Sequence, residues 1–268
     1  MRLSIHSRLR YEVRSPTTFI FAVQVAGAPG DMILAEEISL PEGVAADFLV
    51  ESQGPNRLVR FLAQPGLIEV AYRAEVDKQP LPAAPGNLPA MSIRDLPPAV
   101  LPYLLPSRYC QSDRLPDLAQ REFGHLPAGL AQAQAVSDWI AAEVAYRAGA
   151  SDGGTSAIDT LLDRAGVCRD FAHLGVALCR ALDMPARLAS GYAWKLQPPD
   201  FHAVFQVYLG DAWMTFDATR LAPLDGFVQI AAGRDAADVP FASFFGDAMM
   251  LTMQVEVAQA PALTHEAA

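Results

Sequence analysis

This chain has 268 residues, which allow one large domain or two of ordinary size. Hydrophobic side chains make up 51% of the sequence, ample for a core, and 20 basic against 30 acidic residues give a formal charge of −10. An acidic chain without a basic cluster is a poor partner for nucleic acid. The three cysteines, at positions 110, 168 and 179, lack C-x-x-C spacing and predict neither a disulfide framework nor a zinc ribbon.

The start of the chain predicts no targeting segment. Residues 2–14 alternate charged and apolar side chains and lack the apolar core of a signal peptide. No apolar run approaches the length needed to cross a membrane. Because unpaired cysteines also fit a reducing compartment, we expect a cytoplasmic protein with no membrane partner.

Residues 1–79 predict a domain of antiparallel strands. Apolar side chains alternate with polar ones from Leu3 to Val13 and again from Ile68 to Val76, which is the period of half-buried strands. A small β-sandwich is the architecture that this pattern favours. Further strands, bounded by turns rich in Gly and Pro, are expected at residues 19–25, 33–40 and 57–63.

A connector and three helices are expected next. Six prolines between Lys78 and Pro98 interrupt any periodicity, so residues 80–106 are predicted to link two domains. In the longest of the helices Val136, Trp139 and Ile140 share a face, which indicates core rather than a cofactor site. The three helices are expected at residues 112–123, 128–147 and, capped by Thr155, 155–163.

Cys168 is predicted to lie at the start of a fourth helix. Gly166 can take the left-handed conformation that ends the preceding helix, and apolar residues recur at helical spacing from Phe171 until Pro185. Free N–H groups and the positive end of the helix dipole favour the thiolate over the thiol in this position. The alternative is a buried structural cysteine, the role that we expect for Cys110 and Cys179.

Two strand-like runs follow, residues 202–209 and 212–219, separated by Gly210-Asp211. A two-residue turn of this composition predicts a β-hairpin in which Leu209 opposes Ala212, so that opposed residue numbers sum to 421. One face is then wholly apolar, and the other carries His202 diagonal to Asp217. Slipping the register by one would move both side chains into the apolar face.

A helix-start cysteine with a neighbouring His and Asp suggests a catalytic triad. Cys168 would attack an acyl carbon, His202 would relay the proton, and Asp217 would orient the imidazole. At these residues the chain resembles the transglutaminase-like superfamily, a circularly related branch of the papain-like thiol enzymes. The segments that carry this resemblance are 166–170 with 172–173, 201–203 and 213–219, with support from 190–192, 104–110 and 233–235.

The resemblance implies an α+β fold in which an amino-terminal antiparallel β-sandwich, residues 1–79, leads through the connector to a papain-like catalytic domain at residues 107–258. Residues 259–268 are expected to form a tail. The Cys168 backbone N–H should bind the oxyanion, and the candidates for a second donor are Tyr146 and an amide of the loop before the helix. Trp139 lies too far upstream to replace the tryptophan that animal transglutaminases use, and no EF-hand-like calcium loop is present.

We therefore expect a cysteine protease or amidase that acts on a peptide or protein and needs no cofactor or metal. Transfer of the acyl group to a lysine amine, which would make the chain a crosslinking transglutaminase, uses the same triad and stays open. A noncatalytic binding module is a second alternative, and retention of all three triad residue types speaks against it. A metal-dependent hydrolase ranks last, since the five histidines show no H-E-x-x-H spacing. The oligomeric state is not predicted.

Overall fold

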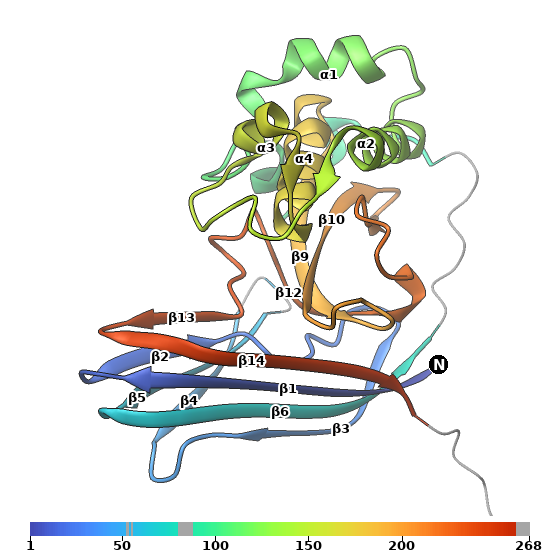
Figure 1. The fold of residues 1–268 in the computed structure, drawn as a ribbon. Helices are drawn as coiled ribbons and strands as arrows, with labels where there is room; N and C mark the ends of the chain where they lie inside the picture. The colour runs from blue at the N-terminus through green and yellow to red at the C-terminus, as the bar shows by residue number, and fades with distance from the viewer. Residues whose placement is uncertain (52–53, 55, 80–87, 261–268) are drawn as a thin grey trace, which may run out of the picture.

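The structure, a computed structural model, describes residues 1–51, 54, 56–79 and 88–260. A strand-only sandwich and a mixed unit of helices and sheet lie one above the other, as Figure 1 shows. The sheets are antiparallel, apart from one short parallel pair, and the predicted α+β fold is confirmed. None of the helices in the described part of the chain has the length and apolarity needed to span a bilayer.

The sandwich is built from two four-stranded sheets whose orders are β14-β1-β6-β3 and β13-β2-β5-β4. In β1 and β6 every second side chain is buried, as the alternation in the sequence predicts. Stacked rings of Phe19, Phe21 and Phe61 fill the space between the sheets. The strands are β1 (Arg2–Val13), β2 (Thr17–Phe21), β3 (Asp31–Ser39), β4 (Ala46–Val50), β5 (Arg57–Ala63), β6 (Gly66–Lys78), β13 (Ala242–Phe245) and β14 (Ala248–Gln259).

The last two strands were assigned wrongly by the sequence analysis. We placed residues up to 258 in the catalytic domain, whereas β14 pairs with β1 along its whole length and β13 pairs with β2. In Figure 1 both strands lie on the sandwich. The pairing gives β1 a neighbour on each side, so that its backbone groups are satisfied. Gln259, expected in the tail, ends β14 opposite Leu3, and residues 261–268 lie outside the described residues.

The second unit surrounds one central helix, α4 (Cys168–Ala181), which packs on β10 and β9 and contacts the other three helices. We expected residues 221–239 to be mostly loop, but β12 lies within them and extends the sheet beyond β9. The other helices are α1 (Pro116–Phe123), α2 (Leu130–Glu143) and α3 (Ala157–Asp163). The sheet, in the order β11-β10-β9-β12, consists of β9 (Ala186–Ala193), β10 (Phe201–Leu209), β11 (Ala212–Phe216) and β12 (Phe227–Gly233).

Two details before helix α4 differ from expectation. Helix α3 is capped by Ser156 rather than Thr155, because the Asp159 carboxylate accepts hydrogen bonds from the Ser156 N–H and hydroxyl. The residue that ends α3 in the left-handed backbone conformation is Arg164, with φ of 51°, and not Gly166. Of the predicted connector, residues 80–87 lie outside the described residues, and the part from 88 onward includes the short 3-10 helices η1 (Ile93–Asp95) and η2 (Leu101–Leu104).

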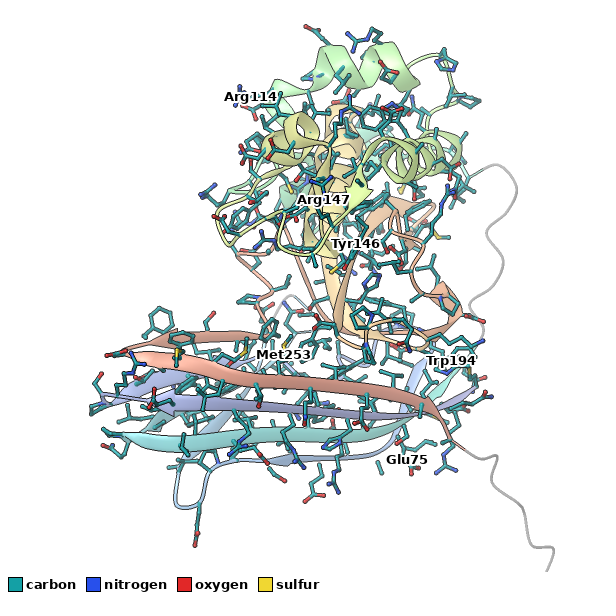
Figure 2. All side chains as sticks on the ribbon, in the orientation of Figure 1. Glu75, Arg114, Tyr146, Arg147, Trp194 and Met253 are labelled. Atoms are coloured by element: carbon teal, nitrogen blue, oxygen red, sulfur yellow. The ribbon has the colours of Figure 1, made fainter. Side chains whose placement is uncertain are left out.

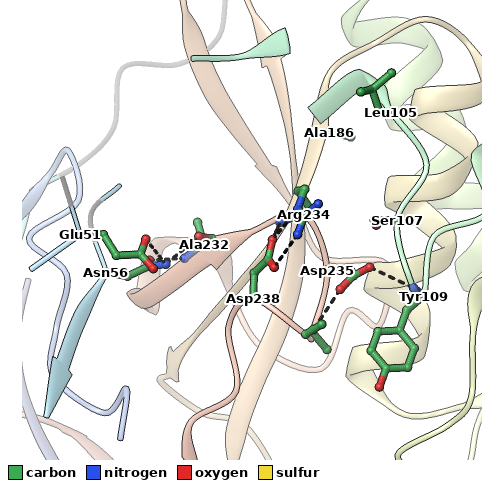
Figure 3. A network of polar contacts seen from close by, with 12 residues as sticks. Glu51, Asn56, Leu105, Ser107, Tyr109, Ala186, Ala232, Arg234, Asp235 and Asp238 are labelled. Carbon is green, nitrogen blue, oxygen red and sulfur yellow. Dashed lines mark hydrogen bonds and ion pairs between the residues drawn. The ribbon is translucent and has the colours of Figure 1, made fainter. Parts of the chain in front are cut away.

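The two units share a tightly bonded junction. The Tyr192 hydroxyl, from β9, donates to the Val23 carbonyl at 2.6 Å and lies 2.9 Å from the Ser7 hydroxyl. In Figure 3, Asn56 of the sandwich bonds both backbone groups of Ala232 in β12. These bonds are buried, where a lost partner is costly. The sandwich therefore holds the sheet that carries the candidate histidine.

Candidate active site

Cys168 is the first residue of α4, as its sequence position predicts. The Asp170 carboxylate accepts a hydrogen bond from the Val167 N–H at 2.8 Å and so caps this helix start. A side chain on Gly166 would place its Cβ 2.7 Å from the Cβ of Asp170, so this close approach requires glycine. Asp170 is fully buried and has a structural role, while the partly exposed Cys168 lies at the N-terminal end of the helix.

The hairpin register is confirmed, with Leu209 opposite Ala212 and Phe205 opposite Phe216. The second strand is shorter than the expected run at residues 212–219, since β11 ends at Phe216 and Asp217 follows it directly. His202 Nε2 lies 2.8 Å from Asp217 Oδ2, and because a carboxylate only accepts, the ring nitrogen donates.

The face of the hairpin that carries His202 is not exposed, although its polar side chains suggested a half-solvated face. Every residue of β10 is buried. Helix α4 covers one face of the strand, and on the other Val204 packs in a small apolar cluster with Phe227. His202 and Asp217 consequently form a buried pair, 1% and 4% exposed at their side chains.

The pair is polarised toward an imidazolium and a carboxylate. Burial alone would lower the pKa of His202, but the hydrogen bond and charge of Asp217, together with the Cys168 sulfur, raise the pKa of His202 to about 9. Burial would raise the pKa of Asp217, whereas bonds from His202 and from Thr219 hold the pKa of that carboxyl below its usual value. Thr219 donates both its N–H, at 2.9 Å, and its hydroxyl, at 2.7 Å, to Asp217 Oδ1.

The other ring nitrogen of His202 is available to the thiol. His202 Nδ1 is buried and has no hydrogen-bond partner among the described residues. The sulfur of Cys168 is nevertheless near enough to favour the protonated ring. The structure thus brings all three predicted residues together, with the imidazole between the carboxylate and the sulfur.

Tyr146 also lies beside Cys168. The short strand β7 (Ala145–Tyr146) runs parallel to β8 (Ala165–Gly166), which places Tyr146 opposite Gly166, and its ring packs on Phe171 with centroids 5.8 Å apart. Burial, followed by the charge of Cys168, raises the pKa of Tyr146 to about 12, and a hydrogen bond with the Cys168 backbone N–H partly offsets that rise. Figure 2 shows Tyr146 within the upper unit. Its hydroxyl therefore stays a donor at neutral pH.

His173 lies away from this site, as its position on the helix predicts. Its ring stacks on Tyr109 with centroids 5.0 Å apart, and its Nε2 accepts a hydrogen bond from the Ala236 N–H. Burial lowers the pKa of His173 to about 3, so the ring is neutral. In Figure 3 the neighbouring Asp235 accepts a hydrogen bond from the Tyr109 N–H. The segments 104–110 and 233–235, which support the family resemblance, are therefore in contact with each other.

Arg180 is a residue of this region that the sequence did not single out. Although 3% exposed, it donates to three backbone carbonyls, those of Leu105, Ala186 and Arg234. A buried guanidinium bonded in this way fastens loop segments to the catalytic helix. The only sign in the sequence was a charged residue on an otherwise apolar helix face.

We expect Cys168 to alkylate much faster than the other two cysteines. Cys110 and Cys179 are completely buried, and burial raises the pKa of Cys110 to about 12 and raises that of Cys179 further. Substoichiometric iodoacetamide at pH 7, followed by peptide mapping in a mass spectrometer, measures the three rates. Similar rates in the folded protein would contradict the assignment of the nucleophile.

Family models match both parts of the chain. The model described as the transglutaminase-like superfamily matches residues 116–218, and the one described as the bacterial transglutaminase N-terminal domain matches residues 1–81. The first match contains Cys168, His202 and Asp217. The second ends within three residues of the predicted boundary of the sandwich at residue 79.

This chain is also similar to a solved structure and to mycobacterial proteins. A crystal structure of a "putative cysteine protease" from Cytophaga hutchinsonii is 45% identical, covers 98% of this chain and 91% of its own, and superposes with a TM-score of 0.92. Uncharacterized proteins of Mycobacterium leprae, 30% identical, and Mycobacterium tuberculosis, 31% identical, match 39% and 38% of this chain. Those matches span only 40% and 37% of the mycobacterial proteins' own length.

Proposed function

This chain belongs to the transglutaminase-like superfamily, and from that premise we propose that it is a thiol enzyme that hydrolyses peptide-like amides through an acyl-enzyme. One observation carries the proposal: the imidazole of His202 is bonded to Asp217 through Nε2 and presents an unpartnered, buried Nδ1 near Cys168. The Nδ1 of His173 is also buried and unpartnered, but His173 has a backbone N–H on its other nitrogen, whereas His202 has a carboxylate there and the Cys168 sulfur nearby. The Cytophaga relative, described as a "putative cysteine protease", supports the same reaction class.

The first half-reaction acylates the thiol. With the thiol proton on His202 Nδ1, the Cys168 sulfur attacks the carbonyl carbon, a C–S bond forms, and the carbonyl π electrons move to oxygen. The donors that we assign to that oxyanion are the Cys168 N–H, which in the free protein bonds to the Tyr146 hydroxyl, and the Tyr146 hydroxyl itself. Collapse breaks the C–N bond, and the Nδ1 proton passes to the departing amine.

The second half-reaction releases the acid. His202 Nδ1 takes a proton from water as the oxygen attacks the thioester, and the C–S bond breaks to regenerate the thiolate. A lysine amine in place of water would give an isopeptide crosslink by the same steps. We favour water, because the second oxyanion donor proposed here is Tyr146 and not the upstream tryptophan of the animal crosslinking enzymes.

Mass spectrometry tests the reaction directly. The protein is incubated with a peptide library, with and without an added primary amine, and both the intact protein and the peptides are weighed. We expect a Cys168 acyl adduct and shortened peptides bearing free carboxylates. Amine-linked peptides as the main product would show a transferase instead, and an unchanged library with no adduct would contradict the proposal.

Activity should fall above about pH 9, the pKa to which Asp217 and Cys168 raise His202. Below that pH the ring holds the proton that the departing amine needs, and above it the ring is neutral. Asp217→Asn removes a charge that raises this pKa, so the alkaline limb of kcat/KM should move to lower pH. The measurement is a pH profile of kcat/KM for both proteins. An alkaline limb that stays in place in the variant would show that another group controls it.

A further inference from the structure

An open groove with a volume of about 490 Å³ begins at Asp217, the residue that holds His202. One wall is the turn that contains Lys195, and the other is the segment 220–224, which includes Arg220. The two walls are fastened together, since the Trp194 N–H donates to the Gly226 carbonyl at 3.1 Å. Figure 2 shows Trp194 where the upper unit meets the sandwich. The groove is therefore a built feature that adjoins the triad.

The backbone of the groove is unusual at its two cations. Lys195 and Arg220 have φ of 65° and 57°, the left-handed region that side chains other than Gly and Asn rarely adopt. The other three such residues end helices or form the hairpin turn: Arg164, Asp183 and Asp211. Lys195 is the third residue of the turn at 193–196, in the loop that joins β9 to β10, and Arg220 follows the turn after β11. Both residues line the groove.

Both cations are available to an anion. The Lys195 ammonium lies 4.0 Å from the centroid of the Trp194 ring, and within the part of the chain that the structure describes it forms no salt bridge. Arg220 is 2.5 Å from Asp138, but those side chains are 61% and 52% exposed. An exposed pair of this type contributes little and exchanges readily with another carboxylate. Of the charged side chains that line the groove, Asp217 is bonded to His202 and Thr219, which leaves the two cations to meet a ligand.

The position of the groove identifies which part of the substrate would reach it. His202 lies between the sulfur and Asp217, and it delivers its proton to the departing amine. The amine side of the scissile bond must therefore lie over the imidazole, and the chain beyond it continues toward Asp217 and the groove. The acyl side faces the opposite direction, past the oxyanion donors.

We infer that Lys195 and Arg220 form an anion subsite that selects substrates with a carboxylate on the leaving-amine side of the scissile bond, as in acidic peptides. This inference rests on the proposed function and specifies its substrate class. The aliphatic edges of Leu221 and Leu224 flank the cations and suit the methylene stem of a glutamate side chain.

Three fluorogenic peptides with the same acyl side test the subsite. They carry Glu, Gln or Lys at the two positions after a scissile bond that the library experiment identifies. We expect kcat/KM to be highest for Glu and lowest for Lys, with a ratio of about 10 between these two, which is the effect of two partly exposed ion pairs. In the double variant Lys195→Glu, Arg220→Glu the order should reverse.

A matched control separates a local effect from net charge. The double variant Arg60→Glu, Arg121→Glu makes the same charge change at side chains that are 50% and 68% exposed and line no wall of the groove, and it should keep the wild-type order. Equal kcat/KM for the Glu and Lys peptides, with turnover that still needs Cys168, would overturn the subsite and leave the proposed function intact.

Peptide binding tests the anion subsite if none of the peptides is cleaved. The three peptides, labelled on the acyl side, are titrated against Cys168→Ala and followed by fluorescence anisotropy. Tighter binding of the Glu peptide, lost in a Cys168→Ala protein that also carries the two charge reversals, supports the subsite while the missing turnover contradicts the proposed function. Equal or undetectable binding of all three peptides overturns the subsite.

Discussion

Cys168→Ala should lower kcat on an identified amide substrate by about 10⁶, the loss seen when the nucleophile of a comparable triad is removed. Without the sulfur no acyl-enzyme forms, and His202 and Asp217 have no nucleophile to activate. What remains is the binding of the substrate and the oxyanion donors. The measurement is single-turnover product formation, which detects slow residual chemistry.

The structure supplies matched controls for this variant. Cys179→Ala removes a completely buried thiol from the same helix, and it should cost some stability through the cavity that it leaves while activity persists. Cys110→Ala is a second control, on a loop behind that helix. Because Cys168 is partly exposed, Cys168→Ala should leave the melting temperature nearly unchanged. Substantial turnover by a folded Cys168→Ala protein would exclude the proposed mechanism.

The part of the site that the sequence predicted best is the hairpin. A two-residue Gly-Asp turn fixes the register locally, so the opposition of Leu209 and Ala212, and with it the approach of His202 to Asp217, followed from neighbouring residues alone. The helix start at Cys168 was equally local. Such features need no knowledge of distant parts of the chain.

Features that depend on distant pairing were not predicted. Strand β14 returns from the end of the chain to lie beside β1, and β12 adds to β9 across a long loop. Apolar alternation shows that a segment is a strand but does not show which sheet it joins. Strand β4 was missed for a different reason: its side chains are mostly exposed, so its sequence lacks the alternation of a half-buried strand.

The return of β14 changes how the sandwich relates to the site. The sandwich is completed only by residues that follow the catalytic hairpin, and Tyr192 and Asn56 bond it to β9 and β12. A strand that carries a side chain of a functional site needs a rigid support to keep its geometry. The sandwich thus supports the sheet of the candidate active site and is not a separate appended module.

The groove illustrates a third limit of the sequence. The residue types at positions 195 and 220 do not indicate a left-handed backbone, because the usual sign of that conformation is Gly or Asn. Their approach to Asp217 also depends on two loops that are distant in sequence. The residues of the proposed triad can therefore be predicted from the sequence, whereas the residues that we infer to select its substrate cannot.

Asp217→Asn should lower kcat by about 10⁴, the cost of the same change in a comparable triad. The asparagine amide keeps the shape but loses the charge that stabilises the imidazolium, and an NH₂ facing Nε2 would hold the wrong tautomer of His202. Its remaining oxygen can still accept the two bonds from Thr219, so the fold should survive. Asp217→Ala is a poorer test, because it leaves the Thr219 N–H and hydroxyl without their acceptor at a cost of about 1–3 kcal/mol for each buried group.

Asp211→Asn is the matched control for this variant. It makes the same chemical change at an exposed position of the hairpin turn, where φ is 66° and asparagine is well tolerated. Its kcat and its pH profile should equal those of the wild type. If Asp217→Asn kept most of the activity while Cys168→Ala abolished it, the enzyme would work as a Cys-His dyad, and the buried His202–Asp217 pair would be structural.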